Sequence, residues 1–183
     1  MAFVADIRPP SFWSRYDGQA FVDVGGDAYF QGVSSPAGDW RATAPRLSFG
    51  FACDTSTKTY GRYESVKLAV ATQSGTTLAN IVVAPSHWYR FRVKAKLAQG
   101  ACTVEVFDQG TAKPTASTAD GTLVATFANV ALPAFGEEGL TTFGIGGNGL
   151  PATYGGGVDD PTVALVDNLA VSFAEQGTFF IVK

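Results

Sequence analysis

The chain has 183 residues and a formal net charge of −3 at pH 7; 46% of its residues are hydrophobic and only 16% are charged. It contains no block of like charge and no apolar run near the ~18 residues of a membrane-spanning helix, so we expect neither a nucleic acid partner nor a membrane span. The length fits one domain, and the 21 glycines and 14 phenylalanines favour an all-β fold with many turns.

The first 19 residues are predicted to form an N-terminal arm ahead of a single domain over residues 20–183. The start of the arm lacks the basic region and the apolar stretch of a signal peptide, so we expect no signal peptide in this chain. Met1 is either the natural start or the first residue after removal of a leader.

Alternation of apolar and polar residues, which is typical of strands, recurs along the domain, and no segment has a clear helical period. In residues 46–53 this alternation places Leu47, Phe49, Phe51 and Cys53 on one face. Further strands are expected over residues 20–24, 28–32, 62–72, 78–83, 122–130, 140–145 and 178–182.

The clearest local prediction is a hairpin between residues 87–97 and residues 102–108. The inward face of its first strand is expected to consist of Tyr89, Phe91, Val93, Ala95 and Leu97. The outward face carries Trp88 and a basic stripe, formed by Arg90, Arg92, Lys94 and Lys96. We interpret the basic stripe as a solvated sheet surface opposite Glu105; the alternative is a docking surface for an acidic glycan or another subunit.

A late strand, residues 162–173, has a carboxylate in the middle of its apolar face. Alternation puts Asp167 on the same side as Val163, Leu165, Leu169, Val171 and Phe173. A buried charge is costly unless it is paired, so we expect Asp167 to contact a cation, an arginine or several backbone amides.

Ten to twelve strands without a helix predict an all-β fold, a two-sheet antiparallel β-sandwich. Three segments, HWYRFRVKAKL, CTVEVFDQG and VALVDNLAVSF, resemble the concanavalin A-like, laminin-G-like jelly roll. The resemblance covers most of residues 20–173 and is closest to the LamG-like domains of secreted and surface proteins of bacteria. It therefore implies a jelly roll and an extracellular or cell-surface location.

The resemblance also implies a structural Ca²⁺ where the first and last strands meet. At matching positions, Asp167 is the expected ligand from the last strand and Asp23 the expected ligand from the N-terminal segment. Calcium takes six to eight oxygen ligands, which include backbone carbonyls. The alternative is that Asp167 caps a turn or pairs with an arginine.

The same superfamily contains enzymes, but their signatures are missing from this chain. Glycoside hydrolysis needs two carboxylates that flank the scissile bond, and the E-x-D-x-E run of the hydrolase branch does not occur. The lyase branch uses a Gln-x-His strand, whereas the one histidine here, His87, follows a serine. We therefore expect a protein that is not an enzyme, with His87 at a strand entrance and without a chemical role.

Aromatic residues in polar, turn-rich segments are the candidates for carbohydrate binding, because sugars stack their apolar faces on such rings. These candidates are Trp13, Trp40, Tyr60 and Tyr154, and the alternative for each is packing at the edge of the sandwich. Cys53 and Cys102 are compatible with one disulfide and equally with two buried thiols.

Two classes of function follow. The first is a non-catalytic, lectin-like module that recognises carbohydrate outside the cell. The second is a structural or adhesion subunit of a bacterial surface assembly or filament, which binds surface protein or copies of itself through edge strands. The mean hydropathy of +0.11 and the apolar C-terminal GTFFIVK support the second, because such a strand can add to a sheet edge of its own chain or of a neighbour.

Overall fold

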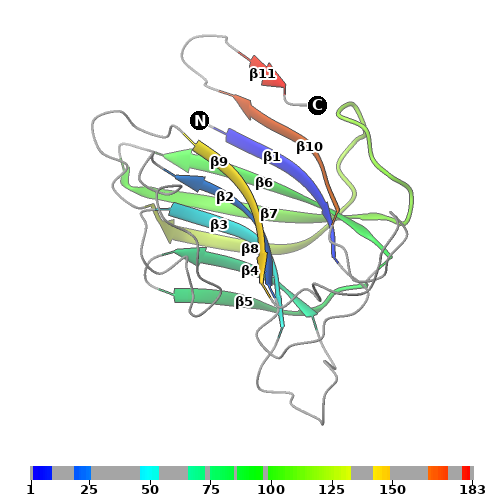
Figure 1. Ribbon diagram of the computed structural model, residues 1–183, viewed down its shortest axis with the longest axis horizontal. Helices are drawn as coiled ribbons and strands as arrows, with labels where there is room; N and C mark the ends of the chain where they lie inside the picture. Colours follow the sequence, from blue (N-terminus) through cyan, green and yellow to red (C-terminus); the bar gives the residue numbers. More distant parts are fainter. Residues whose placement is uncertain are drawn as a thin grey trace.

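A computed structural model describes residues 2–9, 19–25, 46–53, 66–72, 75–84, 86–96, 99–132, 142–148, 165–172 and 179–181. The regular elements of these residues are all β-strands, which lie in two layers (Figure 1). They are β1 (Ala2–Arg8), β2 (Gln19–Gly25), β3 (Arg46–Cys53), β4 (Val66–Thr72), β5 (Gly75–Val82), β6 (Trp88–Lys96), β7 (Ala101–Gly110), β8 (Thr122–Ala131), β9 (Thr142–Asn148), β10 (Leu165–Ser172) and β11 (Phe179–Ile181).

The strands form a six-stranded sheet in the order β11-β10-β1-β6-β7-β8 and a five-stranded sheet in the order β5-β4-β3-β2-β9. Every pair of neighbouring strands is antiparallel. The prediction of an all-β fold with two antiparallel sheets is therefore confirmed. No helix in the described part of the chain has the length and apolar character to cross a membrane.

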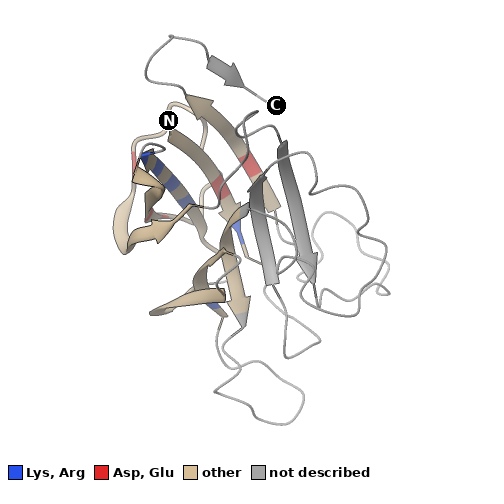
Figure 2. Cartoon of the chain, turned by 90° about the vertical axis from the view of Figure 1, so that its left-hand side faces the viewer, with Lys and Arg blue, Asp and Glu red and all other residues tan. Residues whose placement is uncertain are grey.

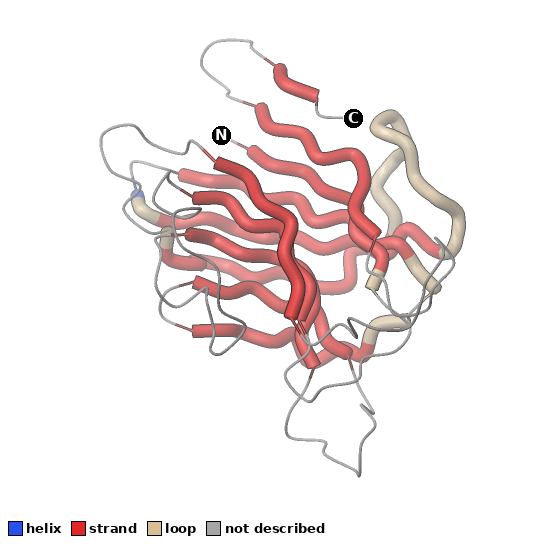
Figure 3. Tube along the Cα trace, viewed as in Figure 1, coloured by secondary structure: helices blue, strands red, loops and turns tan. Residues whose placement is uncertain are grey.

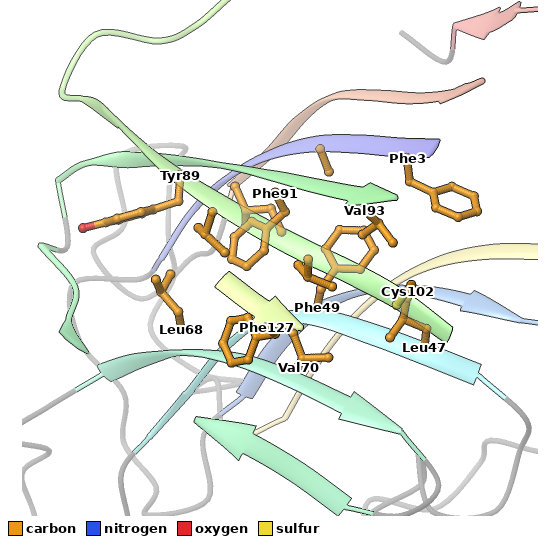
Figure 4. Close-up of a cluster of buried hydrophobic side chains, with 14 of the residues drawn as sticks. Phe3, Leu47, Phe49, Leu68, Val70, Tyr89, Phe91, Val93, Cys102 and Phe127 are labelled. Carbon is orange, nitrogen blue, oxygen red and sulfur yellow. The ribbon is translucent and has the colours of Figure 1, made fainter. Parts of the chain in front are cut away.

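The core lies between the two sheets and is rich in phenylalanine (Figure 4). Phe49 and Phe51 lie two residues apart on the same face of β3, and both contact Phe91 of β6. All three side chains are fully buried. The ring of Phe91 lies 5.8 Å from that of Phe49 and 5.6 Å from that of Phe51, the latter at an edge-to-face angle of 88°. Aromatic pairs in this geometry stabilise the packing beyond the burial of their area.

The predicted hairpin is present as β6 and β7, whose strands pair from Trp88 and Gly110 to Lys96 and Ala101. Its inward face is buried as expected, at Tyr89, Phe91, Val93 and Ala95. The prediction that the basic stripe is a solvated surface is wrong at Arg90, which is buried. Trp88 on the same face is buried as well. Arg90 is covered by a loop that the alternation of the strands does not reveal, and this loop belongs to the site described below.

The prediction of an N-terminal arm is wrong for residues 2–8, which form β1. This strand lies inside the six-stranded sheet, between β10 and β6 (Figure 1). Its alternation places Phe3, Ala5 and Ile7 in the core, and Asp6 on the opposite face is also buried. The apolar residues of β1 are thus removed from water, which stabilises the strand inside the sheet.

At the other end of the chain, the predicted apolar strand is present as β11. It adds to β10 of its own chain, with Phe180 opposite Val171. The strand predicted over residues 28–32 lies outside the described residues.

Cys102 of β7 is a free thiol in the core. Burial raises its pKa to about 11, so it stays protonated and unreactive at neutral pH. The side chain of Cys53 lies outside the described part of the chain.

Candidate functional site

The most deeply buried charge of the described residues is Asp6, in the middle of β1, which is fully shielded from solvent. Arg90 on the neighbouring β6 binds it with two hydrogen bonds: Nε donates to Oδ1 and Nη2 to Oδ2, each at 2.8 Å. The two residues are opposite each other in the register of the sheet. This bidentate geometry is the strongest pairing that a carboxylate and a guanidinium can form, and it raises the pKa of Arg90 above its ordinary value.

Asn168 of β10 approaches the same carboxylate from the other side. Its φ of 52° lies in the left-handed region, which asparagine adopts more readily than most residues. Its Nδ2 donates to Oδ2 of Asp6 at 2.9 Å and to the carbonyl oxygen of Pro114 at 3.0 Å. Asp6 is therefore held from both neighbouring strands (Figure 2 shows the charged positions of these strands).

The loop between β7 and β8, residues 111–121, covers this polar centre, and we refer to it as the strap (Figure 3). Arg90 donates from Nη2 to the carbonyl oxygen of Thr115 at 3.1 Å and from Nη1 to that of Thr118. Asp120 at the end of the strap lies 3.5 Å from Nη1 of Arg90 and forms an ion pair with Arg92. The guanidinium group of Arg90 therefore donates hydrogen bonds both to Asp6 in the sheet and to the strap. We refer to this connection between the sheet and the strap as the buried clamp.

Two members of the basic stripe besides Arg90 also have acidic partners. Arg92 contacts Asp120 and lies 5.0 Å from the ring centre of Phe107, and Lys94 pairs with Glu105 at 2.9 Å. The expected opposition of the stripe and Glu105 is therefore confirmed at Lys94. These partners neutralise much of the charge that an acidic glycan would need.

Asp167 is not the buried carboxylate that the alternation predicts, since its side chain is 30% exposed. A β-bulge is the reason: between the pairs Val4–Ala170 and Asp6–Asp167, β10 has one residue more than β1. One extra residue moves the following side chains to the other face of a sheet. Asp167 lies outside, and the buried acid opposite it is Asp6.

Two contacts hold the carboxylate of Asp167. Its Oδ1 accepts a hydrogen bond from the backbone N of Asn168 at 2.8 Å, and Nζ of Lys113 lies 2.5 Å from its Oδ2. Lys113, through its hydrogen bond and charge, is the main reason why the pKa of Asp167 is lowered. The expected pairing partner is therefore a lysine of the strap rather than an arginine.

These contacts bear on the calcium site that the resemblance implies. Asp23 belongs to β2 in the five-stranded sheet, whereas Asp167 belongs to the other sheet, and the side chain of Asp23 is not described. Among the described residues, no three or more His, Cys, Asp or Glu side chains gather as a metal site. With the ammonium group of Lys113 against its carboxylate, Asp167 does not fit a Ca²⁺ ligand in this arrangement.

Replacing Asp167 with asparagine is expected to lower the free energy of unfolding at pH 7 by less than about 1 kcal/mol, because the pair with Lys113 is largely exposed. The lowered pKa stabilises the folded protein above the ordinary carboxyl pKa, so the difference from the wild type should persist down to about pH 4 and be lost only at lower pH, as the pH falls through the lowered pKa. Urea unfolding at pH 7, at pH 4 and at lower pH measures this. A loss of several kcal/mol would contradict the exposed position of Asp167.

His87 lies at the start of β6, as expected. Its Nδ1 lies 2.9 Å from both carboxylate oxygens of Asp108, at the end of β7. Oδ1 of Asp108 also accepts a hydrogen bond from the backbone N of Gly110 at 2.7 Å. The pair thus joins the two strands at the point where the strap begins.

A groove of about 660 Å³ runs along the side of the sandwich where the edge strands β5 and β8 face each other. Apolar residues from both sheets line it, among them Ile81, Val124 and Phe127. Polar residues also line it, namely Thr72, Thr77 and Asn80 in one sheet and Thr126 and Asn129 in the other. None of the described lining residues is titratable.

The sequence did not single out this groove, because its position depends on the order of strands in each sheet. The four aromatic residues predicted to bind carbohydrate, Trp13, Trp40, Tyr60 and Tyr154, lie outside the described residues. Comparison with known proteins finds no family model, no curated protein and no solved structure that matches this chain. The function is therefore argued from the geometry and from the residues themselves.

Proposed function

We propose that this chain is a non-catalytic binding module with a concanavalin A-like jelly roll, that it acts outside the cell or at the cell surface, and that its ligand is carbohydrate. The observation that carries this proposal is the groove between β5 and β8. It is a long concave surface with an apolar floor and a few polar groups, which is the usual composition of a ligand site.

The chemistry of the groove supports binding rather than turnover. Hydrolysis of a glycosidic bond needs an acid and a base or nucleophile on either side of the bond. The described residues of the lining carry apolar, hydroxyl or amide side chains or are glycine and alanine, and these are not groups that transfer protons at neutral pH.

Isothermal titration of the protein with a panel of linear and branched glycans tests the proposal. We expect saturable binding to at least one glycan, with no release of reducing sugar during a long incubation. Trp40→Ala and Tyr154→Ala report whether the aromatic residues predicted from the sequence contribute to the affinity. Release of reducing sugar would contradict the absence of catalysis, and failure of every glycan to bind would contradict carbohydrate recognition.

The calcium site that the resemblance implies at Asp167 and Asp23 is tested by the melting temperature. A ligand that binds only the folded state raises its stability, so bound Ca²⁺ would raise the melting temperature. Because Lys113 occupies the carboxylate of Asp167, we expect the melting temperature to be the same with excess Ca²⁺ and with a chelator. A rise with Ca²⁺ that Asp167→Asn removes would restore the calcium site.

A second candidate is the assembly subunit, and a separate observation favours it. Among the described strands, β9 and β11 form the sheet edges away from the groove, and they contain no charged residue, although natural edges usually carry charges that prevent strand addition. Light scattering over a range of concentrations tests this candidate: growth in mass with concentration supports it, and a constant monomer mass contradicts it.

A further inference from the structure

Two β-bulges lie on opposite sides of the groove. In β5, the three residues 79–81 lie between Leu78 and Val82, opposite a single residue of β4. In β8, residues 128 and 129 lie between Phe127 and Val130, opposite a single residue of β7. Bulges break the regular pairing of a strand and turn a side chain in a new direction, and they are frequent beside binding sites.

Each of these bulges contains an asparagine, Asn80 in β5 and Asn129 in β8. Both are exposed and both line the groove, and no other described residue of the lining is an asparagine or glutamine. Asn129 has a φ of 55°, in the left-handed region. The two sheets thus each contribute one asparagine to the lining of the same groove, in each case from a bulge of an edge strand.

The chemistry of the lining indicates the ligand. An amide side chain offers both donors and an acceptor, as does a pair of neighbouring sugar hydroxyls. Thr77 and Thr126 add hydroxyl groups to the lining, and Ile81 and Phe127 add apolar surface for the C–H faces of a sugar. The described part of the lining has no charged side chain to compensate a sulfate or carboxylate group that loses water on binding.

The bulges also favour carbohydrate over polypeptide as the ligand of the groove. A peptide that adds to a sheet edge needs a regular series of free backbone donors and acceptors. Both edges beside the groove are interrupted at their bulges, which disfavours addition of a strand. Side-chain amides and hydroxyls are therefore the groups left to recognise a ligand.

We propose that Asn80 and Asn129 bind the hydroxyl groups of an uncharged, linear oligosaccharide that lies along the groove between β5 and β8. The proposal rests on the proposed function and adds the site and the class of glycan. The part of β5 that lines the groove runs from residue 75 to residue 81, so the groove extends over roughly 20 Å at ~3.3 Å a residue. This length suits a chain of several sugars rather than a single one.

The test is a titration of ¹⁵N-labelled protein with neutral linear gluco-, xylo- and manno-oligosaccharides, followed by NMR. We expect the side-chain amide signals of Asn80 and Asn129 to shift with a saturable dependence on one of these sugars. Asn80→Ala and Asn129→Gly should each weaken the affinity about tenfold, as the loss of a ligand hydrogen bond does. Glycine at 129 tolerates the left-handed φ, so this variant removes the amide and keeps the backbone.

Thr76→Ala is the matched control, since Thr76 is exposed on β5 but does not line the groove; its affinity should equal that of the wild type. Equal melting temperatures of all variants verify their folding. Binding of a neutral sugar that Asn80→Ala and Asn129→Gly leave unchanged, but Trp40→Ala or Tyr154→Ala removes, would overturn the groove site and leave the proposed function standing.

The remaining outcomes are equally decisive. Tighter binding of a sulfated or uronic acid oligosaccharide than of any neutral one would overturn the ligand class. Shifts of the two amide signals caused by an uncharged extended peptide, but by no sugar, would replace carbohydrate with polypeptide as the occupant. Failure of the wild type to bind any glycan would overturn the proposed function together with this inference.

Discussion

Replacing Arg90 with alanine is expected to lower the free energy of unfolding by about 3–5 kcal/mol. The variant would leave the carboxylate of Asp6 fully buried with Asn168 as its remaining side-chain partner. It would also remove the hydrogen bonds to the carbonyl oxygens of Thr115 and Thr118, which hold the strap. Urea unfolding at pH 7, followed by tryptophan fluorescence, measures the loss.

Arg92→Ala is the matched control, because Arg92 is the next outward residue on β6 and its pair with Asp120 is partly exposed. We expect it to cost less than about 1 kcal/mol. The double variant Asp6→Leu, Arg90→Met removes both charges and should be much more stable than Arg90→Ala, since an apolar pair needs no compensation in the interior. Similar losses for Arg90→Ala and Arg92→Ala would contradict the buried clamp.

Replacing Phe91 with alanine is expected to destabilise the protein by about 3–5 kcal/mol, the usual cost of removing a buried phenylalanine side chain. Phe91 is fully buried and contacts Phe49 and Phe51 of the opposite sheet. The loss would combine the transfer free energy of the ring with the cavity left between the sheets. Urea unfolding again provides the measurement, with the slope of the transition as a check on two-state behaviour.

Phe107→Ala serves as the comparison for Phe91, since Phe107 is a phenylalanine of the same hairpin that is half-buried on the outer side. Phe107→Ala should lower the free energy of unfolding by less than half as much as Phe91→Ala does. A double-mutant cycle of Phe51 and Phe91 should yield a coupling of about 0.5–1.5 kcal/mol. Additive losses in this cycle would mean that the two rings do not meet across the sandwich.

The hairpin of β6 and β7 was the easiest part of the fold to predict. Its first strand alternates strictly and its turn contains glycine, so burial of Tyr89, Phe91, Val93 and Ala95 follows from the period of a strand. Two packed antiparallel sheets then follow from the number of such strands and the lack of helices. These are local properties, which the order of residues along one strand determines.

The sequence predicts that the six-stranded sheet contains a buried carboxylate, but it does not predict which residue carries it. The sequence indicates a carboxylate inside the late strand, yet the bulge in β10 moves Asp167 outward, and Asp6 takes the buried position opposite it. A signal for β1 was present only in its second half, where Ala5 and Ile7 alternate with the charged residues Asp6 and Arg8. Asn168, with its left-handed φ, is the residue that marks the bulge.

The strap and the groove could not be predicted, because neither depends on the pattern of a single strand. The alternation of β6 predicts that Arg90 is solvated. It is buried because the strap folds over it, with a contact at Thr115, twenty-five residues later in the chain. The groove exists because β5 and β8 are the last strands on the same side of the two sheets. Asn80 and Asn129 acquire a shared environment only through this arrangement.

A crystal structure of the protein grown with a neutral linear oligosaccharide would show directly where the sugar binds. We expect sugar density along the side of the sandwich between β5 and β8, with hydroxyl groups within hydrogen-bond distance of the side chains of Asn80 and Asn129. Sugar bound elsewhere, at Trp40 or Tyr154 with the groove filled by solvent, would contradict this expectation.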